Sequence, residues 1–253
     1  IAAITRDEFV AFHRENYRIG NVALLVVGDV SEKEVTEAAR ILTCGVPRGA
    51  LITRPERLKE GPTPKTNEVI ESSAKLFGLK GAARMKATKI RFQRILPWPW
   101  KETRAPDIGL RLVRELLMSR IRRELGVMYS PSWGLGDFID HQHASMSVEI
   151  LPSALKPALA IMRQIRNEIA AGERKHAKLF DEVKNAYIEQ LRFRDDEVEN
   201  IGYSACCEFN LRGRVIPIGE DVRYTEETSY RDVSDLFARE FTEEKLFWTI
   251  LTP

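Results

Sequence analysis

Arg122 and Tyr129 are the side chains whose types and spacing are best suited to chemistry on an extended peptide. Arg122 lies near the end of a predicted amphipathic helix, and Tyr129 follows seven residues later, beyond Gly126. Glycine readily adopts the left-handed conformation that ends helices, so Gly126 predicts an abrupt passage from helix to strand. At such a junction a guanidinium and a phenol can donate hydrogen bonds to one peptide. The alternative is that Arg122 offsets the helix dipole and that Tyr129 is a half-buried strand residue.

The histidines predict no metal site in this chain. They are His13, His141, His143 and His176, and none of them lies in a His-x-x-Glu-His or His-Glu-x-x-His motif. His141 and His143 have the spacing of two residues on one face of a strand. No third ligand accompanies them, so a solvated pair is preferred over a metal site.

The composition bounds the class of protein. At 253 residues the chain holds one large domain or two small ones, and a net charge of +2 without a recognition motif argues against a nucleic-acid surface. Three cysteines do not make a disulfide framework, and Cys206 and Cys207 are expected to be buried in a helix. No apolar run is long enough to span a membrane, so no span is expected. The compartment stays open between bacterial periplasm and cytoplasm.

The elements that position Arg122 and Tyr129 begin with helix starts. Capping boxes at Thr5 and Ser31 predict two helices. Between them, the apolar run NVALLVVG (residues 21–28) predicts a strand that is buried on both faces. Residues 44–66 hold four prolines among polar residues and predict a long surface connection, which is the best candidate for a boundary. Because Ile1 already lies within a helical pattern, we expect a fragment.

Further elements follow from hydrophobic periodicity and from turn residues. Strands are predicted near residues 68–75, 87–96, 127–133 and 144–151, the last two joined by a turn at 134–137. Helices are predicted over residues 105–125, 153–171, 174–193 and 197–211. Helices and strands that mix without strict alternation favour an α+β fold, in which helices pack on a mixed or antiparallel sheet.

A helix that leads into a buried strand occurs at both ends of the chain. When the N-terminal helix and strand are shifted by 224 positions, six of their apolar residues fall on apolar residues of the C-terminal helix and strand. The six pairs are Phe9 and Val233, Phe12 and Leu236, Tyr17 and Phe241, Val22 and Leu246, Leu24 and Trp248, and Val26 and Ile250. A unit that recurs at about the length of a domain predicts one module of a tandem array.

Four segments, in order, resemble the pitrilysin/insulinase family of inverted-motif zinc peptidases, which includes the mitochondrial processing peptidases. They are FHRENYRIGNVALLVVGDVSEKEV (residues 12–35), SRIRRELGVMYS (119–130), LPSALKPALAIMRQIRNEIAAG (151–172) and DVSDLFAREFTEEKLFWTILTP (232–253). The chain departs from the family at the glycine-rich turn that usually precedes the second segment, because residues 115–118 read as plain helix. A substrate role for a glycine loop is therefore not expected.

The resemblance implies a fold of repeated α+β modules, whose two halves close around an unfolded peptide. It places zinc on a His-x-x-Glu-His helix, which this chain lacks, so zinc is expected in a partner catalytic module on the same chain or on a separate subunit. It also implies that Arg122 and Tyr129 bind the substrate backbone at the partner's zinc site, as an auxiliary pair.

We therefore expect residues 1–20 to belong to or link from a preceding module, and residues 21–253 to form a zinc-less module that is inactive alone. Its partners would be the zinc-bearing module and an unfolded peptide, with no nucleic acid. Two alternatives stay open. In the first alternative, the chain is the second module of the catalytic half, cut from its zinc module. In the second, it is a structural subunit with this fold and no peptidase role.

Overall fold

The computed structural model describes residues 4–49, 56–72, 75, 87–97, 104–126, 131–194 and 198–253. These residues divide into two compact units. The first unit consists of Ile1–Glu56 and Arg194–Ile216, and the second of Arg57–Phe193 and Pro217–Pro253. The division at residue 56 falls inside the proline-rich connection (44–66), which holds no helix or strand in its described part.

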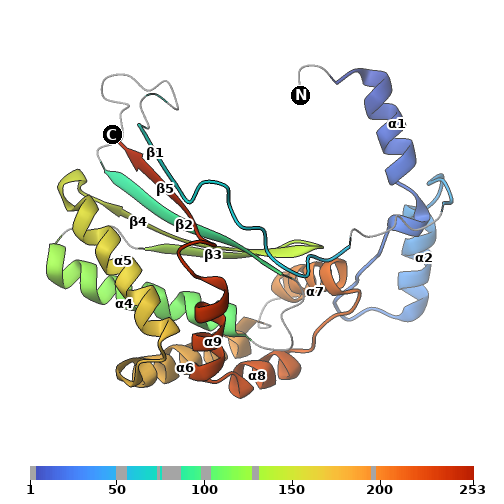
Figure 1. Ribbon diagram of the computed structural model, residues 1–253. Helices are drawn as coiled ribbons and strands as arrows, with labels where there is room; N and C mark the ends of the chain where they lie inside the picture. The colour runs from blue at the N-terminus through green and yellow to red at the C-terminus, as the bar shows by residue number, and fades with distance from the viewer. Residues whose placement is uncertain are drawn as a thin grey trace. The chain divides into compact units, whose positions relative to one another are not determined.

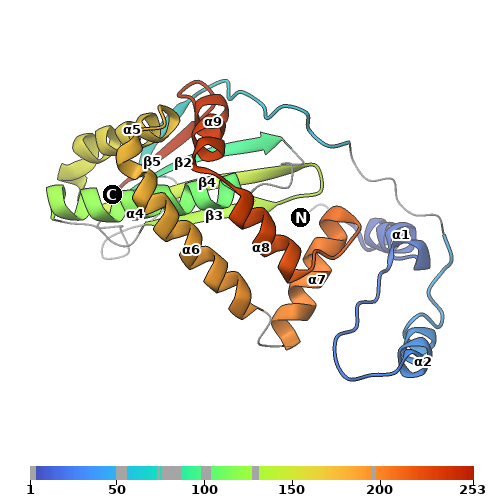
Figure 2. The same cartoon turned by 90° about the horizontal axis from the view of Figure 1, so that it is seen from below.

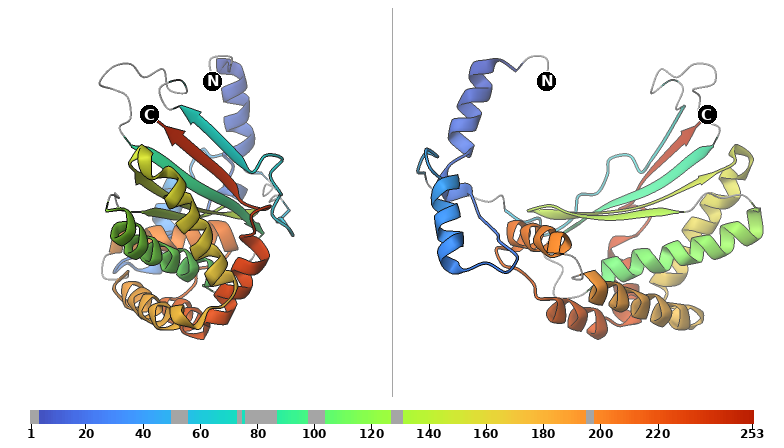
Figure 3. Two further views of the ribbon diagram at one scale, coloured as in Figure 1. Left: turned by 60° about the vertical axis from the view of Figure 1, so that its left-hand side comes forward. Right: turned by 180° about the vertical axis from the view of Figure 1, so that it is seen from behind.

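A five-stranded mixed sheet forms the centre of the second unit (Figures 1 and 3). Its strands are β1 (Glu68–Ser72), β2 (Thr88–Pro97), β3 (Ser132–Asp137), β4 (His141–Ile150) and β5 (Phe247–Thr252), and they lie in the order β1-β5-β2-β4-β3. β5 pairs in parallel with β1 and antiparallel with β2, and the other pairs are antiparallel. The predicted α+β class with a mixed sheet is therefore confirmed.

One face of this sheet is covered by helices α4 (Ala105–Leu125), α5 (Leu155–Ala170) and α9 (Tyr230–Glu240), as Figure 1 shows. Side chains of β2 alternate strictly between buried and half-buried, so every second residue enters the core beneath the helices. The largest fully buried side chains are Trp248, Phe92, Phe237, Phe241, Ile90, Leu96, Ile108, Leu110, Leu112, Leu117, Ile121 and Met146.

Helices α6 (Ala177–Arg194) and α8 (Ile218–Glu227) lie on the helical side of the sheet, in front of it in Figure 2. Short 3₁₀ turns η3 (Pro152–Ala154) and η4 (Arg174–His176) lead into α5 and α6. Helix α8 is not among the helices that the sequence predicts. No described helix combines the length and the apolar character that crossing a membrane requires.

The first unit contains α1 (Arg6–Asn16), the 3₁₀ turn η1 (Ile19–Asn21), α2 (Glu32–Leu42) and α7 (Val198–Arg212). Both predicted capping boxes are present, at Thr5 with Glu8 and at Ser31 with Glu34. Neither α1 nor α2 contains a buried residue. Helices stay folded mainly through packing of an apolar face, so this unit offers little packing of its own.

The strand predicted over residues 21–28 is wrong for the chain as described, because residues 22–27 form neither helix nor strand and pair with no described strand. Val22, Leu24, Val26 and Val27 in this run are exposed. An apolar run indicates that a segment prefers to be buried, but it does not say which chain supplies the cover.

Two smaller predictions are also corrected. Gly134 and Gly136 lie on β3, opposite Ser145 and His143, and the turn falls at residues 138–140. These glycines alternate with half-buried residues that pack on the core, so their spacing was a strand pattern rather than a turn signal. Of the adjacent cysteines on α7, the first is exposed and the second half-buried, whereas burial was expected.

Candidate functional site at the end of α4

Arg122 lies in the last turn of α4, and its side chain is exposed. The helix ends at Gly126, which adopts the predicted left-handed conformation with φ of 67°. Residues 115–118 lie within the helix, so the departure from a glycine-rich turn is confirmed. Tyr129 lies outside the described residues, three positions before β3 begins at Ser132.

Three arginines near this helix end differ in their partners. Arg120 binds Glu168 on α5, and Arg123 donates from Nε to the Ser119 carbonyl oxygen at 2.8 Å. Arg122 forms no hydrogen bond or ion pair with any residue that the structure describes. A cation that is exposed and not committed to the fold is available to a ligand, whereas its two neighbours serve the fold.

The carboxylate of Glu168 fixes this end of α4 to α5 and η4. Its Oε1 accepts from Arg120 Nη1 at 3.1 Å and from Gln164 Nε2 at 2.8 Å, and it lies 3.0 Å from Lys175 Nζ. Its Oε2 binds Arg120 Nη2 and lies 2.9 Å from His176 Nε2. The turn that carries Arg122 is therefore held by a charged, largely buried cluster, which the sequence did not reveal.

The electrostatics of Glu168 follow from this cluster. Burial by itself raises the pKa of the carboxyl, since it disfavours the charged form. Hydrogen bonds from Arg120, Lys175, His176 and Gln164 outweigh burial and lower the pKa from 4.5 to about 2. Glu168 is therefore ionised at any physiological pH, and its charge is neutralised by the protein itself.

This cluster does not fit a catalytic zinc ion. Among the described residues, the group of His, Cys, Asp and Glu side chains close enough to share a metal is Glu168, Glu173 and His176. Both oxygens of Glu168 already accept from cations or an amide, and Lys175 also binds Glu173 at 2.6 Å. A catalytic zinc site needs uncommitted ligands and an open coordination position. We therefore derive no metal chemistry from these residues.

His141 and His143 lie on β4, on the sheet face away from the helices. The His141 ring lies 2.7 Å from Asp140 Oδ1 and stacks on Phe138. The His143 ring lies 3.0 Å from the Gln93 amide oxygen, and burial, with the nearby charges of Arg91 and His141, lowers its pKa. Each ring therefore has a hydrogen-bonding partner of its own among the described residues.

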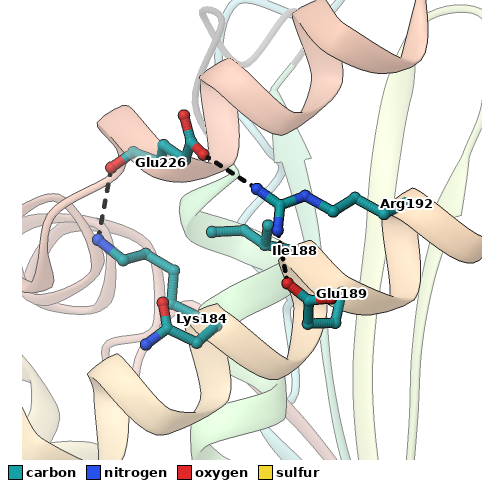
Figure 4. Close-up of a pocket in the computed structure, with 6 residues that line it drawn as sticks. Lys184, Ile188, Glu189, Arg192 and Glu226 are labelled. Atoms are coloured by element: carbon teal, nitrogen blue, oxygen red, sulfur yellow. Dashed lines mark hydrogen bonds and ion pairs between the residues drawn. The ribbon is translucent and has the colours of Figure 1, made fainter.

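A surface pocket of about 260 Å³ lies between α6 and α8 (Figure 4). Its cations are engaged: Lys184 Nζ lies 3.4 Å from the Glu226 carbonyl oxygen, and Arg192 Nη1 lies 2.6 Å from Glu189 Oε1. The lining residues include no histidine, cysteine or serine. We therefore assign no catalytic role to this pocket.

The fold and the site define a class of protein: an α+β module without a zinc motif, which exposes an uncommitted arginine at the end of a helix. The family "Peptidase M16 inactive domain" matches residues 3–187, most of the chain. The chain belongs to this family of zinc-less modules, as the resemblance to pitrilysin and insulinase implied. No curated protein sequence matches the chain.

Solved structures share the fold at low sequence identity. The inactive domain of an M16 peptidase from Pseudomonas fluorescens has 16% identity and a TM-score of 0.77, and the match covers 100% of this chain and 58% of that one. A protease from Helicobacter pylori has 13% identity and a TM-score of 0.73, with 100% and 60% covered. The ferredoxin protease FusC in complex with Arabidopsis ferredoxin has 12% identity and a TM-score of 0.58, with 98% and 30% covered. The chain thus spans less than two thirds of each relative.

Proposed function

We propose that this chain completes the peptide-binding chamber of an M16 zinc peptidase and presents Arg122 and Tyr129 to substrate at the zinc site of a catalytic partner module. The observation that carries the proposal is the state of Arg122, which is exposed and bound to no described residue, on a helix end that Glu168 holds in place. As assigned from the sequence, residues 1–20 belong to or link from a preceding module. The substrate would be an unfolded peptide.

The proposed chemistry is electrostatic. Hydrolysis of a peptide bond develops negative charge on the carbonyl oxygen, and donors fixed in advance near that oxygen stabilise the transition state. The guanidinium of Arg122 stays protonated and carries five N–H donors, and the phenol of Tyr129 adds a neutral one. The partner's zinc would activate water, and this chain would bind and orient the peptide backbone. FusC, bound to a ferredoxin, is a relative that holds a protein ligand.

The test compares two neighbouring arginines in the assembly reconstituted with the zinc-bearing module. Arg122→Ala should lower kcat/KM for peptide cleavage by about 10²- to 10³-fold, the usual loss for a donor to a developing oxyanion. Tyr129→Phe should lower it as well. Arg123→Ala removes the same charge one residue further along the helix, where the guanidinium is engaged with Ser119, and should leave turnover near that of the parent.

Equal turnover in Arg122→Ala and Arg123→Ala would contradict the proposal and favour a purely structural subunit. Because the Arg122 side chain is exposed, its truncation should leave the unfolding midpoint unchanged. A loss of activity that comes with a lower midpoint would instead point to a damaged fold. Measuring both quantities on the same preparations separates the two effects.

A further inference from the structure

A charged cluster that the proposed function does not use lies where α4, β3 and α6 meet (Figure 2). At its centre is Arg111 of α4, whose guanidinium contacts two aromatic rings. Its Cζ lies 4.0 Å from the ring centroid of Tyr187 on α6 and 4.8 Å from that of Trp133 on β3. Its Nη1 donates to Gln190 Oε1 on α6 at 2.9 Å. One side chain thus joins a strand and two helices.

This arginine attaches the second half of α6 to the rest of the unit. The first half is held by apolar packing, because Phe180 and Val183 belong to the core cluster. In the second half, Ile188 and Leu191 are buried but lie outside that cluster. Within the described structure, the hydrogen bonds and ring contacts that join this half to α4 and β3 are those of Arg111. A change that releases Arg111 therefore loosens this half of the helix.

Asp107 lies one helical turn before Arg111 and competes for its charge. Its Oδ1 is 3.9 Å from Arg111 Nε, which is too far for a hydrogen bond, and the carboxylate accepts no hydrogen bond from any residue that the structure describes. Arg111 Nε is buried and also has no hydrogen-bond partner in the described structure. A hydrogen bond between the two would satisfy both groups. It would move the guanidinium by about 1 Å toward Asp107 and lengthen its bond to Gln190.

The groups that act on the charge of Asp107 come from every element packed against it. Besides Arg111, they are Arg104 on α4, Asp137 on β3, Tyr187 on α6 and Asp221 on α8. The two arginines favour the ionised carboxyl, and the two aspartates disfavour it. Burial outweighs the arginines and raises the pKa of Asp107 to about 6. Burial and Asp107 also raise the pKa of the Tyr187 phenol, which therefore stays neutral while Asp107 changes its charge.

We propose that Asp107 and Arg111 form a proton-operated latch for the second half of α6. With Asp107 neutral, Arg111 stays between Trp133 and Tyr187 and holds this half of α6 against α4 and β3. With Asp107 ionised, the carboxylate attracts Arg111 away from the rings, water enters the cluster, and the second half of α6 opens more often. The helical side of the second unit is then tighter in acid than at neutral pH. This inference goes beyond the proposed role of Arg122 and does not depend on it.

Native-state hydrogen exchange of this 253-residue chain tests the latch. The opening of residues 187–191 is compared at pH 5 and at pH 8, after correction for the intrinsic exchange rate at each pH. An Asp107 carboxyl whose pKa is about 6 in the closed state and 3.8 in the open state makes opening about tenfold more frequent at pH 8 than at pH 5. The amides of residues 88–96 in β2 report global unfolding, and they should open less often than residues 187–191 at both pH values.

Three variants separate the parts of the latch. Asp107→Asn keeps the shape of the side chain but cannot ionise, so residues 187–191 should open at both pH values as rarely as in the parent at pH 5. Arg111→Gln removes the latch itself and should give frequent opening at both pH values. Glu115→Gln is the matched control, because Glu115 is an acid on the same helix with a side chain that is 40% exposed. It should keep the pH dependence of the parent.

Three outcomes would overturn the proposal. If residues 187–191 open only as often as β2 at both pH values, this half of α6 opens only with the whole fold. If the change between pH 5 and pH 8 persists in Asp107→Asn, another group causes it. If opening in Arg111→Gln is as rare as in the parent at pH 5, Arg111 does not hold the helix. Protection of residues 88–96 shows in each variant that the sheet is still folded.

Discussion

Replacing Glu168 with glutamine keeps the shape of the side chain and removes its charge from the centre of the cluster that holds the end of α4. The side chain is 6% exposed, and Arg120, Lys175 and His176 surround it. Solvent screens this site little, so in Glu168→Gln the surrounding cations lose the negative charge that balances them. Unfolding should become easier at neutral pH.

The pKa of Glu168 sets the magnitude of this effect. A carboxyl whose pKa falls from 4.5 to about 2 on folding stabilises the folded state by about 3 kcal/mol when ionised in both states. Because the folded pKa is the lower one, this stabilisation is present above pH 4.5 and is lost as the pH falls toward 2. By pH 3 about 2 kcal/mol should be gone. Glu168→Gln should lower the unfolding free energy by about 2 to 3 kcal/mol at pH 7.

Urea unfolding followed by tryptophan fluorescence measures this, since all four tryptophans belong to the second unit. The gap between the parent and Glu168→Gln should narrow steadily from pH 6 to pH 3. A constant gap would refute the reasoning, because the effect of the substitution would then not depend on the ionisation of the Glu168 carboxyl. Glu173→Gln is the matched control: this glutamate also binds Lys175, but its side chain is 41% exposed, so its loss should cost less than about 1 kcal/mol.

Two further predictions concern charges at the margins of the core. Burial raises the pKa of Asp107 from 3.8 to about 6. Because the folded pKa is the higher one, the stabilisation by the Asp107 carboxyl is present below pH 3.8 and is lost as the pH rises through 6. In the same unfolding assay, Asp107→Asn should stabilise the fold by about 2 kcal/mol at pH 8 and very little at pH 4. A larger gain in unfolding free energy at pH 4 than at pH 8 would contradict the upward direction of this pKa shift. Arg94, with a side chain 1% exposed, binds Glu240 at 2.8 Å and the Pro62 carbonyl oxygen at 2.7 Å. Arg94→Gln should cost about 3 kcal/mol and speed tryptic cleavage at Lys59; unchanged cleavage would mean that Arg94 does not hold this connection.

The sequence predicted the elements whose signals are local. The capping boxes at Thr5 and Ser31, the left-handed glycine at Gly126 and the alternation of β2 each depend on neighbouring residues, and each is present. The similarity between the two ends of the chain also predicts a helix and a buried strand where α9 and β5 lie.

The sequence failed where the structure depends on residues that are far apart in the sequence. The run at residues 21–28 prefers burial, but no local signal says whether the rest of this chain covers it, and Val22, Leu24, Val26 and Val27 are exposed. Arg120 and Glu168 are 48 positions apart, and nothing in either neighbourhood predicts their bond. For the same reason, residue type, spacing and resemblance point to Arg122 in the sequence, but only the structure shows that it has no partner among the described residues.

The place of β5 has a consequence for how the chain is made. The strand that joins β1 to β2 is β5 (Phe247–Thr252), which is translated after the other four strands of this sheet. Until those residues emerge, β1 has no described neighbour and one edge of β2 stays unpaired. Nascent chains with open strand edges are prone to aggregate, and pairing between strands so far apart in the sequence, as Glu68 is from Trp248, is slow. Removing Phe247–Thr252 would therefore leave two strand edges open at once, so the yield of folded protein should fall when β5 is deleted.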